Sequence, residues 1–391
     1  MITVVGYAGG PLPEPARAAL AGAGLVAGGR RHLQAVPVPE GARRLELGDV
    51  AAATAELAAY AGDAVVVASG DPGFFGIVRT LRQRGVTPTV LPAVGAVAAA
   101  FARLGLPWDD AVVVSAHGRP LRRAANACRA FPKVAVLTGP GAGPAELARA
   151  LHGWSRRLVV AEHLGEPTER LTAGRPEELA GRAWAEPNVV LCLDEARPGP
   201  AEVWTDQVAI PPAGWALPDA GFAHRDGMLT KREVRALVLA RLAPTLGDLV
   251  WDVGAGSGAV GVECARFGAA VVAVERDGVE LVRRNADAHG VDVRAVAGVA
   301  PAALADLPDP DAVFVGGGGP EVLAACLARG PGRVVVALAA VDRVPPVQRL
   351  LAAAGYPTDG VLLAASRLAD LPDGAVRLAA TNPVFVLGGQ R

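Results

Sequence analysis

Three closely spaced glycines follow an apolar run in the second half of the chain. They are Gly254, Gly256 and Gly258, and after a helical stretch a second apolar run ends in Glu275. In an open α/β sheet, ligands bind beyond the carboxyl ends of the strands, where glycines let the backbone approach the ligand and an acid at a strand end can hold ribose hydroxyls. The pattern therefore predicts a site for an adenosine-type cofactor.

The residues around these glycines bear on which cofactor this is. Gly254, Gly256 and Ala259 satisfy the dinucleotide fingerprint, so an NAD-dependent dehydrogenase is one interpretation. Asp252 lies at the strand end, where methyltransferases commonly place an acid near the amino-acid part of S-adenosylmethionine. The third glycine, and a helix predicted over 230–242 that could cover the pocket, also favour this methyl donor. A fold of the same type without any ligand is the third interpretation.

The helix predicted over 230–242 has a sequence signal for its first turn. Thr230 and Glu233 have capping-box spacing, in which the hydroxyl and the carboxylate each accept from exposed amides. Val234, Leu237 and Leu242 then follow a helical stripe. We therefore expect Thr230 to begin the helix.

A second glycine loop lies in the first half of the chain. Gly70 follows an apolar run and tolerates unusual backbone angles, Asp71 can cap the loop, and Pro72 fixes the turn into the next helix. By itself this loop could equally be an ordinary strand-to-helix turn.

Short apolar runs alternate with helical patterns along the chain, which predicts α/β sheets in both halves. Several prolines interrupt the pattern between 197 and 222, so we place a linker at 201–220 between a domain over 1–200 and a domain over 221–391. The predicted strands are 3–6, 64–68, 112–115, 134–137, 158–161, 189–193, 250–253, 271–275, 293–297, 312–315, 334–338, 361–365 and 384–387.

Length and composition bear on several protein classes. The 391 residues suit two domains, and no apolar run reaches the ~18–20 residues that a membrane span requires. A net charge of -1 gives no electrostatic reason to expect a nucleic-acid partner. The 4 cysteines are far apart and suggest neither a disulfide framework nor a metal site. Because the chain begins directly on a strand-like segment, we expect a cytoplasmic protein.

Arginine supplies almost all of the positive charge, since Lys133 and Lys231 are the only lysines. Genomic base composition is one explanation. The other is a polycarboxylate ligand, because the guanidinium group can bind a carboxylate through two hydrogen bonds. The sequence alone does not separate these explanations.

Residues 222–391 resemble the decarboxylating precorrin methyltransferase domain of cobalamin biosynthesis. The matching segments are 222–235, 251–258, 274–277, 298–304, 310–319 and 382–384. The resemblance implies a Rossmann-like class I methyltransferase fold, with Glu275 on the ribose of S-adenosylmethionine. It implies that Gly316 and Gly317 let the backbone approach the substrate or the reacting methyl group, although a flexible strand-end turn is the structural alternative. The cofactor contacts that it implies are Thr230, Asp252, Gly254, Ala255, Gly256, Ser257, Gly258, Glu275 and Ala300.

Residues 1–195 resemble the tetrapyrrole methylases, a family with two α/β lobes that binds S-adenosylmethionine in the cleft between them. The matching segments, in the family's order, are 4–7, 68–77, 91–97, 115–119, 137–140 and 161–167. The resemblance implies cofactor contacts from the loops that follow the strands. These contacts are Gly70, Asp71, Pro72, Phe74, Gly95, Ala96, Thr138 and Gly139.

The chain departs from both families at a few positions. The loop that begins at Gly6 is shorter than usual and lacks an acid, which affects the substrate side of the cleft. Ala96 stands where a serine or threonine is frequent, so only backbone contacts are expected there. Ala337 stands where the precorrin methyltransferase domain usually has an asparagine, so a polar contact normally made at that position is not expected here.

Four charged or polar side chains are candidates for the substrate side. His117 and Arg119 follow a predicted strand and could line the N-terminal cleft, or they could be structural groups of a loop. His224 and Arg225, followed by Asp226, could form a lid over the C-terminal pocket that pairs with substrate carboxylates. The structural alternative is a polar hinge before the helix.

Together the two halves resemble the domains of one fused, decarboxylating precorrin methyltransferase. This resemblance implies two S-adenosylmethionine sites, a polycarboxylate tetrapyrrole substrate and a homo-oligomer. It also implies methylation at C5 by the first domain, and methylation at C15 with loss of the C12 acetate carboxyl by the second. The alternatives are another tetrapyrrole, a diphthamide-type protein substrate for the first half, or a corrinoid carrier without catalytic activity.

Overall fold

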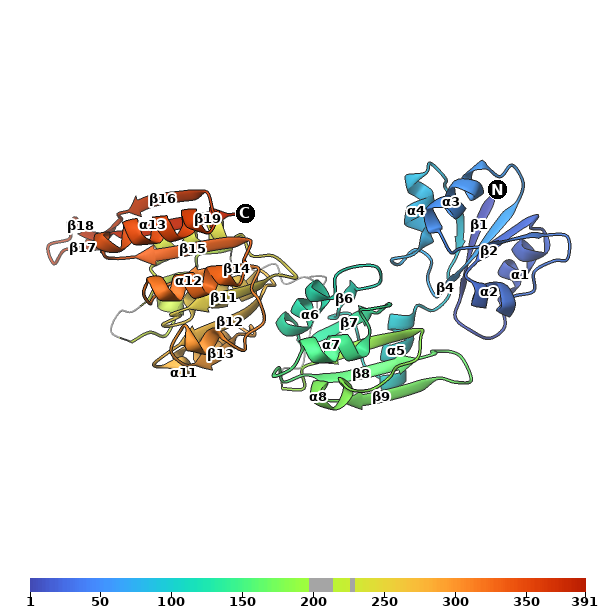
Figure 1. Ribbon diagram of the computed structural model, residues 1–391, viewed down its shortest axis with the longest axis horizontal. Helices are drawn as coiled ribbons and strands as arrows, with labels where there is room; N and C mark the ends of the chain where they lie inside the picture. The colour runs from blue at the N-terminus through green and yellow to red at the C-terminus, as the bar shows by residue number, and fades with distance from the viewer. Residues whose placement is uncertain (197–213, 226–228) are drawn as a thin grey trace. The chain divides into compact units, whose positions relative to one another are not determined.

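A computed structural model describes residues 1–196, 214–225 and 229–391 of the chain, which divide into two compact units (Figure 1). The N-terminal unit comprises Met1–Arg119 and Ala135–Glu195, and the C-terminal unit comprises Pro120–Val134 and Ala196–Arg391. Within the described residues, no helix has the length and apolar character that a membrane span needs.

The first sheet of the N-terminal unit is parallel, in the order β3-β2-β4-β1-β5. Its inner strands are buried on both faces, as the continuous valine runs of β1 and β4 predict. Its strands are β1 (Ile2–Tyr7), β2 (Leu25–Gly28), β3 (Arg43–Glu46), β4 (Ala64–Ser69) and β5 (Thr89–Leu91), and its helices are α1 (Glu14–Ala21), α2 (Arg30–Ala35), α3 (Val50–Ala59) and α4 (Ile77–Gln83).

The second sheet has the order β6-β7-β10-β8-β9, with β8 antiparallel to both of its neighbours. Helix α5 covers part of it, and the apolar side chains of α5, β8 and β10 form one core. The strands are β6 (Val112–Ser115), β7 (Lys133–Leu137), β8 (Arg157–Glu162), β9 (Arg170–Gly174) and β10 (Asn188–Leu193), and the helices are α5 (Ala96–Leu104), α7 (Pro144–Ala150) and α8 (Pro176–Leu179). Helix α6 (Leu121–Ala130) is counted with the C-terminal unit.

The C-terminal unit contains a seven-stranded sheet in the order β13-β12-β11-β14-β15-β19-β16. The first five strands are parallel, and β19 is antiparallel to β15 and to β16. The strands are β11 (Leu249–Val253), β12 (Ala270–Glu275), β13 (Arg294–Ala297), β14 (Ala312–Val315), β15 (Arg333–Leu338), β16 (Thr358–Leu363) and β19 (Val384–Gln390). The α-helices are α9 (Arg232–Leu242), α10 (Ala259–Arg266), α11 (Val279–Ala288), α12 (Pro320–Ala328) and α13 (Val344–Ala353), and the short 3₁₀ helices are η1 (Asp219–Gly221), η2 (Ala302–Leu304) and η3 (Val341–Arg343).

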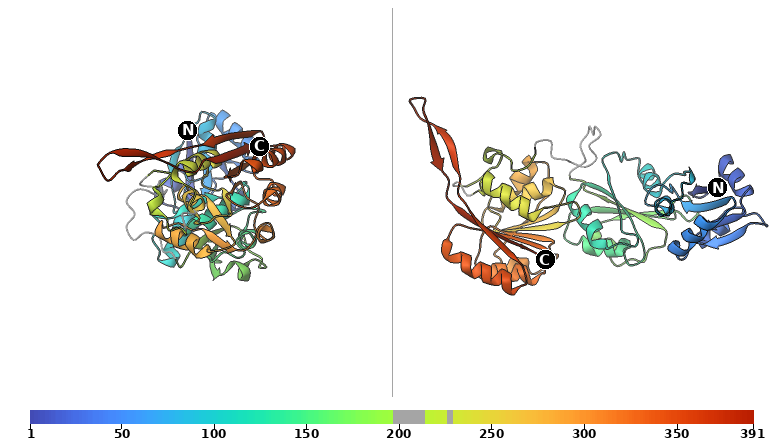
Figure 2. Two further views of the ribbon diagram at one scale, coloured as in Figure 1. Left: turned by 90° about the vertical axis from the view of Figure 1, so that its left-hand side faces the viewer. Right: turned by 90° about the horizontal axis from the view of Figure 1, so that it is seen from above.

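A two-stranded hairpin extends from the edge of this sheet. It consists of β17 (Ser366–Asp370) and β18 (Val376–Ala380), and Figure 2 shows it projecting away from the rest of the unit. Leu368 pairs with Leu378 across the hairpin, and both side chains are exposed, at 77% and 67%. One face of the hairpin is therefore apolar and open to solvent.

The predicted strands are present, and the α/β class is observed in both units. The strand expected at 361–365 lies instead at Thr358–Leu363. Strands β2, β3, β5, β9, β17 and β18 were not predicted, because each is short and all except β2 have exposed or partly exposed positions.

The predicted capping box at the start of α9 is wrong. The helix begins at Arg232 and its N-cap residue is Lys231, so Thr230 lies before it and caps no amide with its side chain. The carboxylate of Glu233 is bound by Arg367 instead, at 2.9 and 2.7 Å. A two-bond ion pair with a guanidinium takes precedence over the local capping interaction.

The proline-rich segment predicted as a linker lies partly outside the described residues, namely at 197–213. The described part packs on the C-terminal unit. The backbone amides of Ala216 and Leu217 donate to the carboxylate of Glu263 on α10, at 2.6 and 3.0 Å. Arg235 of α9 binds the same carboxylate, and the side chains of Arg235 and Glu263 are fully buried.

Candidate functional sites

The glycine loop of the C-terminal unit lies where the direction of strand order reverses. Strand β11 lies between β12, which follows it in sequence, and β14, so the loops after β11 and β14 diverge at the carboxyl edge. This is the position at which open α/β sheets bind ligands. Gly254 and Gly317 belong to these two loops, and a Cβ on Gly254 would lie 2.7 Å from the backbone nitrogen of Gly317. Gly254 also has a φ of +69°, which glycine adopts more readily than other residues. Both the close contact and the backbone angle therefore require glycine here.

Asp252 is fully buried at the end of β11, beneath this loop. Its Oδ2 accepts a hydrogen bond of 2.8 Å from the amide of Gly261, whereas its Oδ1 has no partner. Burial, with a smaller contribution from the nearby charge of Glu275, raises the pKa of Asp252 to about 7. A buried acceptor without a partner is a position for a donor group of a ligand.

Glu275 ends β12, next to the glycine loop. The amide of Gly256 donates to its Oε2 at 2.7 Å, and the amide of Asp277 donates to its Oε1 at 3.1 Å. Each carboxylate oxygen thus accepts a hydrogen bond from one backbone amide, and each has a further lone pair that can accept from a ligand hydroxyl group. Ala300 and Gly298 follow the neighbouring strand β13, and the amide of Gly298 donates to the backbone of Glu275.

Asn285 is a residue of this site that the sequence did not reveal. It is buried on α11, and its Nδ2 donates to the carbonyls of Ser257 and Ala223, at 2.7 and 2.8 Å. Its Oδ1 accepts from the amide of Ala223. Asn285 therefore joins the glycine loop to the segment before α9; an asparagine inside a helical stripe was the only sequence signal.

The predicted lid residues belong to this segment. His224 and Arg225 are exposed, and Asp226 lies outside the described residues. The backbone oxygen of Thr230 accepts a hydrogen bond from Arg235. Gly316 is exposed and donates its amide to the carbonyl of Val253, which keeps the loop after β14 against the end of β11.

These features fit an adenosine-type cofactor. A side chain on Gly254 would fill the space against Gly317, the unpartnered oxygen of Asp252 can receive an ammonium group, and Glu275 can receive a ribose diol. Among the described residues, no cluster of His, Cys, Asp and Glu could hold a metal ion.

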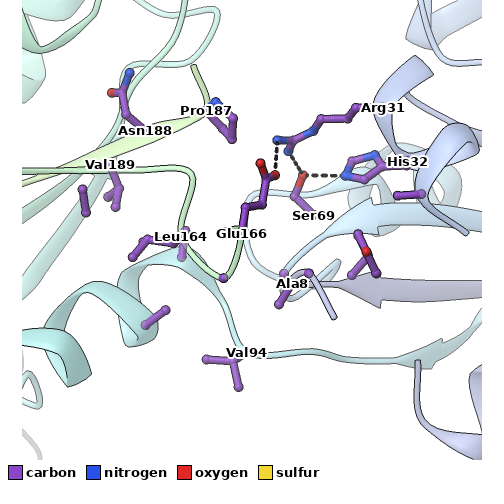
Figure 3. A pocket seen from close by; sticks show the side chains of 18 of the residues that line it. Ala8, Arg31, His32, Ser69, Val94, Leu164, Glu166, Pro187, Asn188 and Val189 are labelled. Atoms are coloured by element: carbon purple, nitrogen blue, oxygen red, sulfur yellow. Dashed lines mark hydrogen bonds and ion pairs between the residues drawn. The ribbon is translucent and has the colours of Figure 1, made fainter. Parts of the chain in front are cut away.

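The N-terminal unit contains a cleft of ≈ 860 Å³, lined by residues of both of its sheets (Figure 3). Gly70 and Val94 come from the loops after β4 and β5, and Ala96 begins α5, whereas Leu164 follows β8 and Asn188 begins β10. The end of β1 contacts the loops after β4 and β5, because a Cβ on Gly6 would collide with the backbone of Gly70 and of Ala93. Asp71 caps its own loop as expected, since its Oδ1 accepts from the amide of Gly73 at 2.8 Å.

A second group of predicted residues lies at the end of β7. The hydroxyl of Thr138 donates within the protein, to Asn188 at 2.6 Å, and the Nδ1 of His117 lies 3.2 Å from the carbonyl of Thr138. The space beside Gly139 is filled by the same imidazole ring. His117, Thr138 and Gly139 thus form one cluster. The hydroxyl proton of Thr138 is engaged in a hydrogen bond to Asn188.

Two further predicted residues, Phe74 and Arg119, lie in an aromatic group with Phe75 after Pro72, whereas Gly95 is the N-cap residue of α5. Phe74 is 43% exposed and contacts Phe75 edge to face, with ring centroids 4.8 Å apart. The guanidinium of Arg119 lies 5.6 Å from the centre of the Phe75 ring. Phe75 has a φ of +52°, an unusual backbone angle for an aromatic residue.

Arg31, His32 and Ser69 are polar lining residues of the cleft that the sequence did not single out. Because β2 and β4 are adjacent and parallel, the residues that follow them meet at one edge. The Nη2 of Arg31 donates to the Oγ of Ser69 at 2.7 Å, and the Nε2 of His32 lies 3.1 Å from the same oxygen. Burial, followed by the charge of Arg31, lowers the pKa of His32 to about 4.

Comparison with known proteins covers both units. Residues 5–180 match the family model of the tetrapyrrole (corrin/porphyrin) methylases, and residues 221–363 match the model of the precorrin methyltransferase domain. A precorrin-6Y C(5,15)-methyltransferase [decarboxylating] of a Sinorhizobium species is 40% identical over 326 residues, which is 79% of this chain and 76% of the relative. The chain belongs to this family.

Two shorter relatives correspond to parts of the chain. A cobalt-precorrin-7 C(5)-methyltransferase of Salmonella typhimurium is 38% identical over 207 residues, which is 50% of this chain and 100% of the relative. A protein of Pyrobaculum calidifontis, named "Probable cobalt-precorrin-6B C(15)-methyltransferase (decarboxylating)", is 40% identical over 132 residues, which is 31% of this chain and 68% of the relative.

The predicted family, the two α/β folds and the methyltransferase class are confirmed by these matches. Dehydrogenase chemistry, which the glycine pattern of Gly254 and Gly256 also allowed, is thereby set aside. In a family of methyltransferases, the donor expected for both glycine loops is S-adenosylmethionine.

Proposed function

We propose that this chain methylates C5 and C15 of a precorrin and removes carbon dioxide from its C12 acetate arm. The observation that carries the proposal is the match, at 40% identity over 79% of the chain, to a relative named for both methylations and for decarboxylation. The N-terminal unit would methylate C5, and the C-terminal unit would methylate C15 and decarboxylate. The two shorter relatives, each named for one of these carbons, support this division.

We propose one donor site in each unit. In the C-terminal unit Asp252, Glu275 and the loop 254–258 would hold the cofactor, with Thr230, Ala255, Ser257 and Ala300 around it. In the N-terminal unit the loops that contain Gly70, Gly95 and Thr138 would do so. When bound, S-adenosylmethionine would supply the methyl group of a sulfonium, whose sulfur leaves as a neutral thioether.

The residues of both sites are suited to positioning rather than to proton transfer. Methyl transfer is an in-line displacement, and a ring carbon of a reduced tetrapyrrole is already nucleophilic. Alignment of the two reacting atoms can lower the barrier by about 7–11 kcal/mol. Backbone loops braced by buried groups, such as Asp252 under Gly261 and Asn285 under Ser257, provide such rigid alignment.

The test of this proposal uses the whole chain, precorrin-6B and S-adenosylmethionine, with product masses as the readout. The wild-type protein is expected to add two methyl groups and to release one carbon dioxide. Gly70→Arg is expected to lose only the C5 methylation, and Gly256→Arg to lose the C15 methylation and the decarboxylation. A wild-type product with no added methyl mass contradicts the function, and loss of both methylations in either variant contradicts the division of labour.

We also propose that the protein assembles with copies of itself and is found in the cytoplasm. The exposed apolar face of the β17–β18 hairpin supports assembly, because a contiguous apolar surface on a protein marks an interaction site. Cell fractionation tests the location.

A further inference from the structure

We infer that Arg31, oriented by Ser69 and His32, is the binding site for a carboxylate arm of the substrate in the cleft of the N-terminal unit. This inference rests on the proposed function for the class of substrate. Arg31 would touch the substrate, whereas Ser69 and His32 act through Arg31 as positioning residues.

Arg31 and His32 both contact the hydroxyl of Ser69, and the direction of the first contact is fixed by chemistry. The guanidinium of Arg31 can only donate, so the hydroxyl oxygen of Ser69 accepts from it. The hydroxyl proton of Ser69 can then point at the Nε2 of His32, which accepts it when the neutral ring carries its proton on Nδ1. Burial of His32 and its lowered pKa agree with a neutral ring at physiological pH. The result is a chain of donors from Arg31 through Ser69 to His32 that fixes the guanidinium in one orientation.

The charge of Arg31 is only weakly balanced. Its nearest carboxylate is that of Glu166, with the closest nitrogen and oxygen 4.0 Å apart, and both side chains are nearly half exposed. Figure 3 shows the two side chains reaching toward each other from the two sides of the cleft. An exposed pair at this distance is worth little, so an incoming carboxylate can replace Glu166.

The other arginine that lines the cleft is engaged. Arg103 binds Glu169 through two hydrogen bonds, of 2.6 and 3.1 Å, and that carboxylate also accepts from the amide of Gly165. Among the described lining residues, Arg31 is therefore the cation that can receive a ligand carboxylate with its planar fork.

Arg31 lies beside the proposed donor loop, so a carboxylate bound to Arg31 would also orient the substrate toward that loop. Ser69 directly precedes Gly70, the first residue of the proposed donor loop. A carboxylate held by Arg31 thus fixes the tetrapyrrole within a few residues of that loop. We infer that this contact selects which edge of the macrocycle, and hence which ring carbon, faces the methyl group.

The direct test measures binding of uroporphyrin, a tetrapyrrole with eight carboxylate arms, by fluorescence titration of the full chain. Arg31→Gln is expected to weaken binding about 10–100-fold, the loss typical of a two-bond contact with a charged group. Ser69→Ala, which keeps the charge but frees its orientation, is expected to weaken binding about 2–10-fold. Glu166→Gln is expected to strengthen binding, because the competing carboxylate is removed. Arg30→Gln is the matched control, since Arg30 is exposed and paired with Glu46.

Two further measurements separate this role from a structural one. Calorimetric titration with S-adenosylhomocysteine should give the same affinity for Arg31→Gln and the wild type. In the methylation assay, Arg31→Gln should raise the KM for C5 methylation much more than it lowers kcat, with the C15 reaction unchanged.

The inference is overturned if the wild type does not bind uroporphyrin, if Arg31→Gln binds it normally, or if Glu166→Gln weakens binding. Loss of S-adenosylhomocysteine binding in Arg31→Gln would also overturn it, since Arg31 would then support the fold of the loop. If uroporphyrin binding depends on Arg31 but precorrin is not methylated, the proposed function fails and the carboxylate site remains.

Discussion

At the scale of single residues, the site of the C-terminal unit depends on one position without room for a side chain and on one atom without a partner. Gly254 has no space for a side chain, and Asp252 has a buried oxygen without a hydrogen bond. The unpartnered oxygen of Asp252 costs the native state free energy, whereas Gly254 adopts its positive φ without strain. Substitutions at these residues should therefore separate stability from binding.

Gly254→Ala is expected to destabilise the C-terminal unit by about 1–3 kcal/mol and to abolish its methyl transfer. The new Cβ would lie 2.7 Å from the nitrogen of Gly317 and would push apart the loops that form the site. Gly290→Ala is the matched control, because Gly290 has a φ of +63° and nothing lies within 4 Å of its Cβ position. Unfolding measurements and product masses check both. Equal effects of the two substitutions would show that backbone strain alone is responsible.

Asp252→Asn is expected to stabilise the cofactor-free C-terminal unit at pH 8. The folded pKa of about 7 lies above the ordinary value of 3.8, so the native state retains a proton that the unfolded chain has lost between these pH values. Stability therefore falls as the pH rises from about 4 through 7, and the asparagine removes this fall, by about 1–4 kcal/mol.

Hydrogen exchange of the amides of β11 and α10 at pH 5 and pH 8 measures this effect in the C-terminal unit alone. The same variant should bind S-adenosylhomocysteine more weakly, because the acceptor for its ammonium group has lost its charge. The raised pKa would be contradicted if the opening free energies of the wild type, corrected for the intrinsic pH dependence of exchange, were equal at pH 5 and pH 8.

At the scale of elements, one buried cation holds together the segment before α9. Arg235 contacts the carboxylate of Glu263, the backbone of Leu217 and Thr230, and the ring of Phe222. Helices α9 and α10 and the described residues from 214 onward thus share one buried polar centre. The centre fixes the approach to the pocket from which His224 and Arg225 extend.

Arg235→Met is expected to destabilise the C-terminal unit by about 3–5 kcal/mol, because it leaves the buried carboxylate of Glu263 without a cation. The double variant Arg235→Met/Glu263→Gln should recover part of this loss, since its buried groups are uncharged. Urea unfolding of the single and double variants measures the difference. A double variant less stable than Arg235→Met would show that the charge is not the cause.

At the scale of the whole molecule, sequence patterns predicted the buried framework better than the sites. Runs such as that of β4 are apolar because both faces of the strand are covered, so they are recognisable without a structure. Strand β3, with the sequence Arg-Arg-Leu-Glu, has an exposed edge and carries no such pattern. Arg31 and Ser69 are distant in sequence and meet only because β2 lies beside β4, an order that periodicity does not reveal.

The exposed face of the β17–β18 hairpin leads to a prediction about assembly. Leu368→Glu with Leu378→Glu is expected to lower the molar mass measured by light scattering after gel filtration, because charge would replace the apolar surface. Arg377→Gln is the control, since Arg377 pairs with Ala369 on the opposite face of the hairpin. A wild-type protein that elutes as a single chain, or a double variant of unchanged mass, would contradict assembly through the hairpin.

Glu275 finally bears on the speed of ligand capture. Its two oxygens already hold the amides of Gly256 and Asp277 before any ligand arrives, so the acidic rim needs no rearrangement to accept a diol. In stopped-flow experiments the observed association rate should then rise linearly with ligand concentration, without a plateau from a slow closing step.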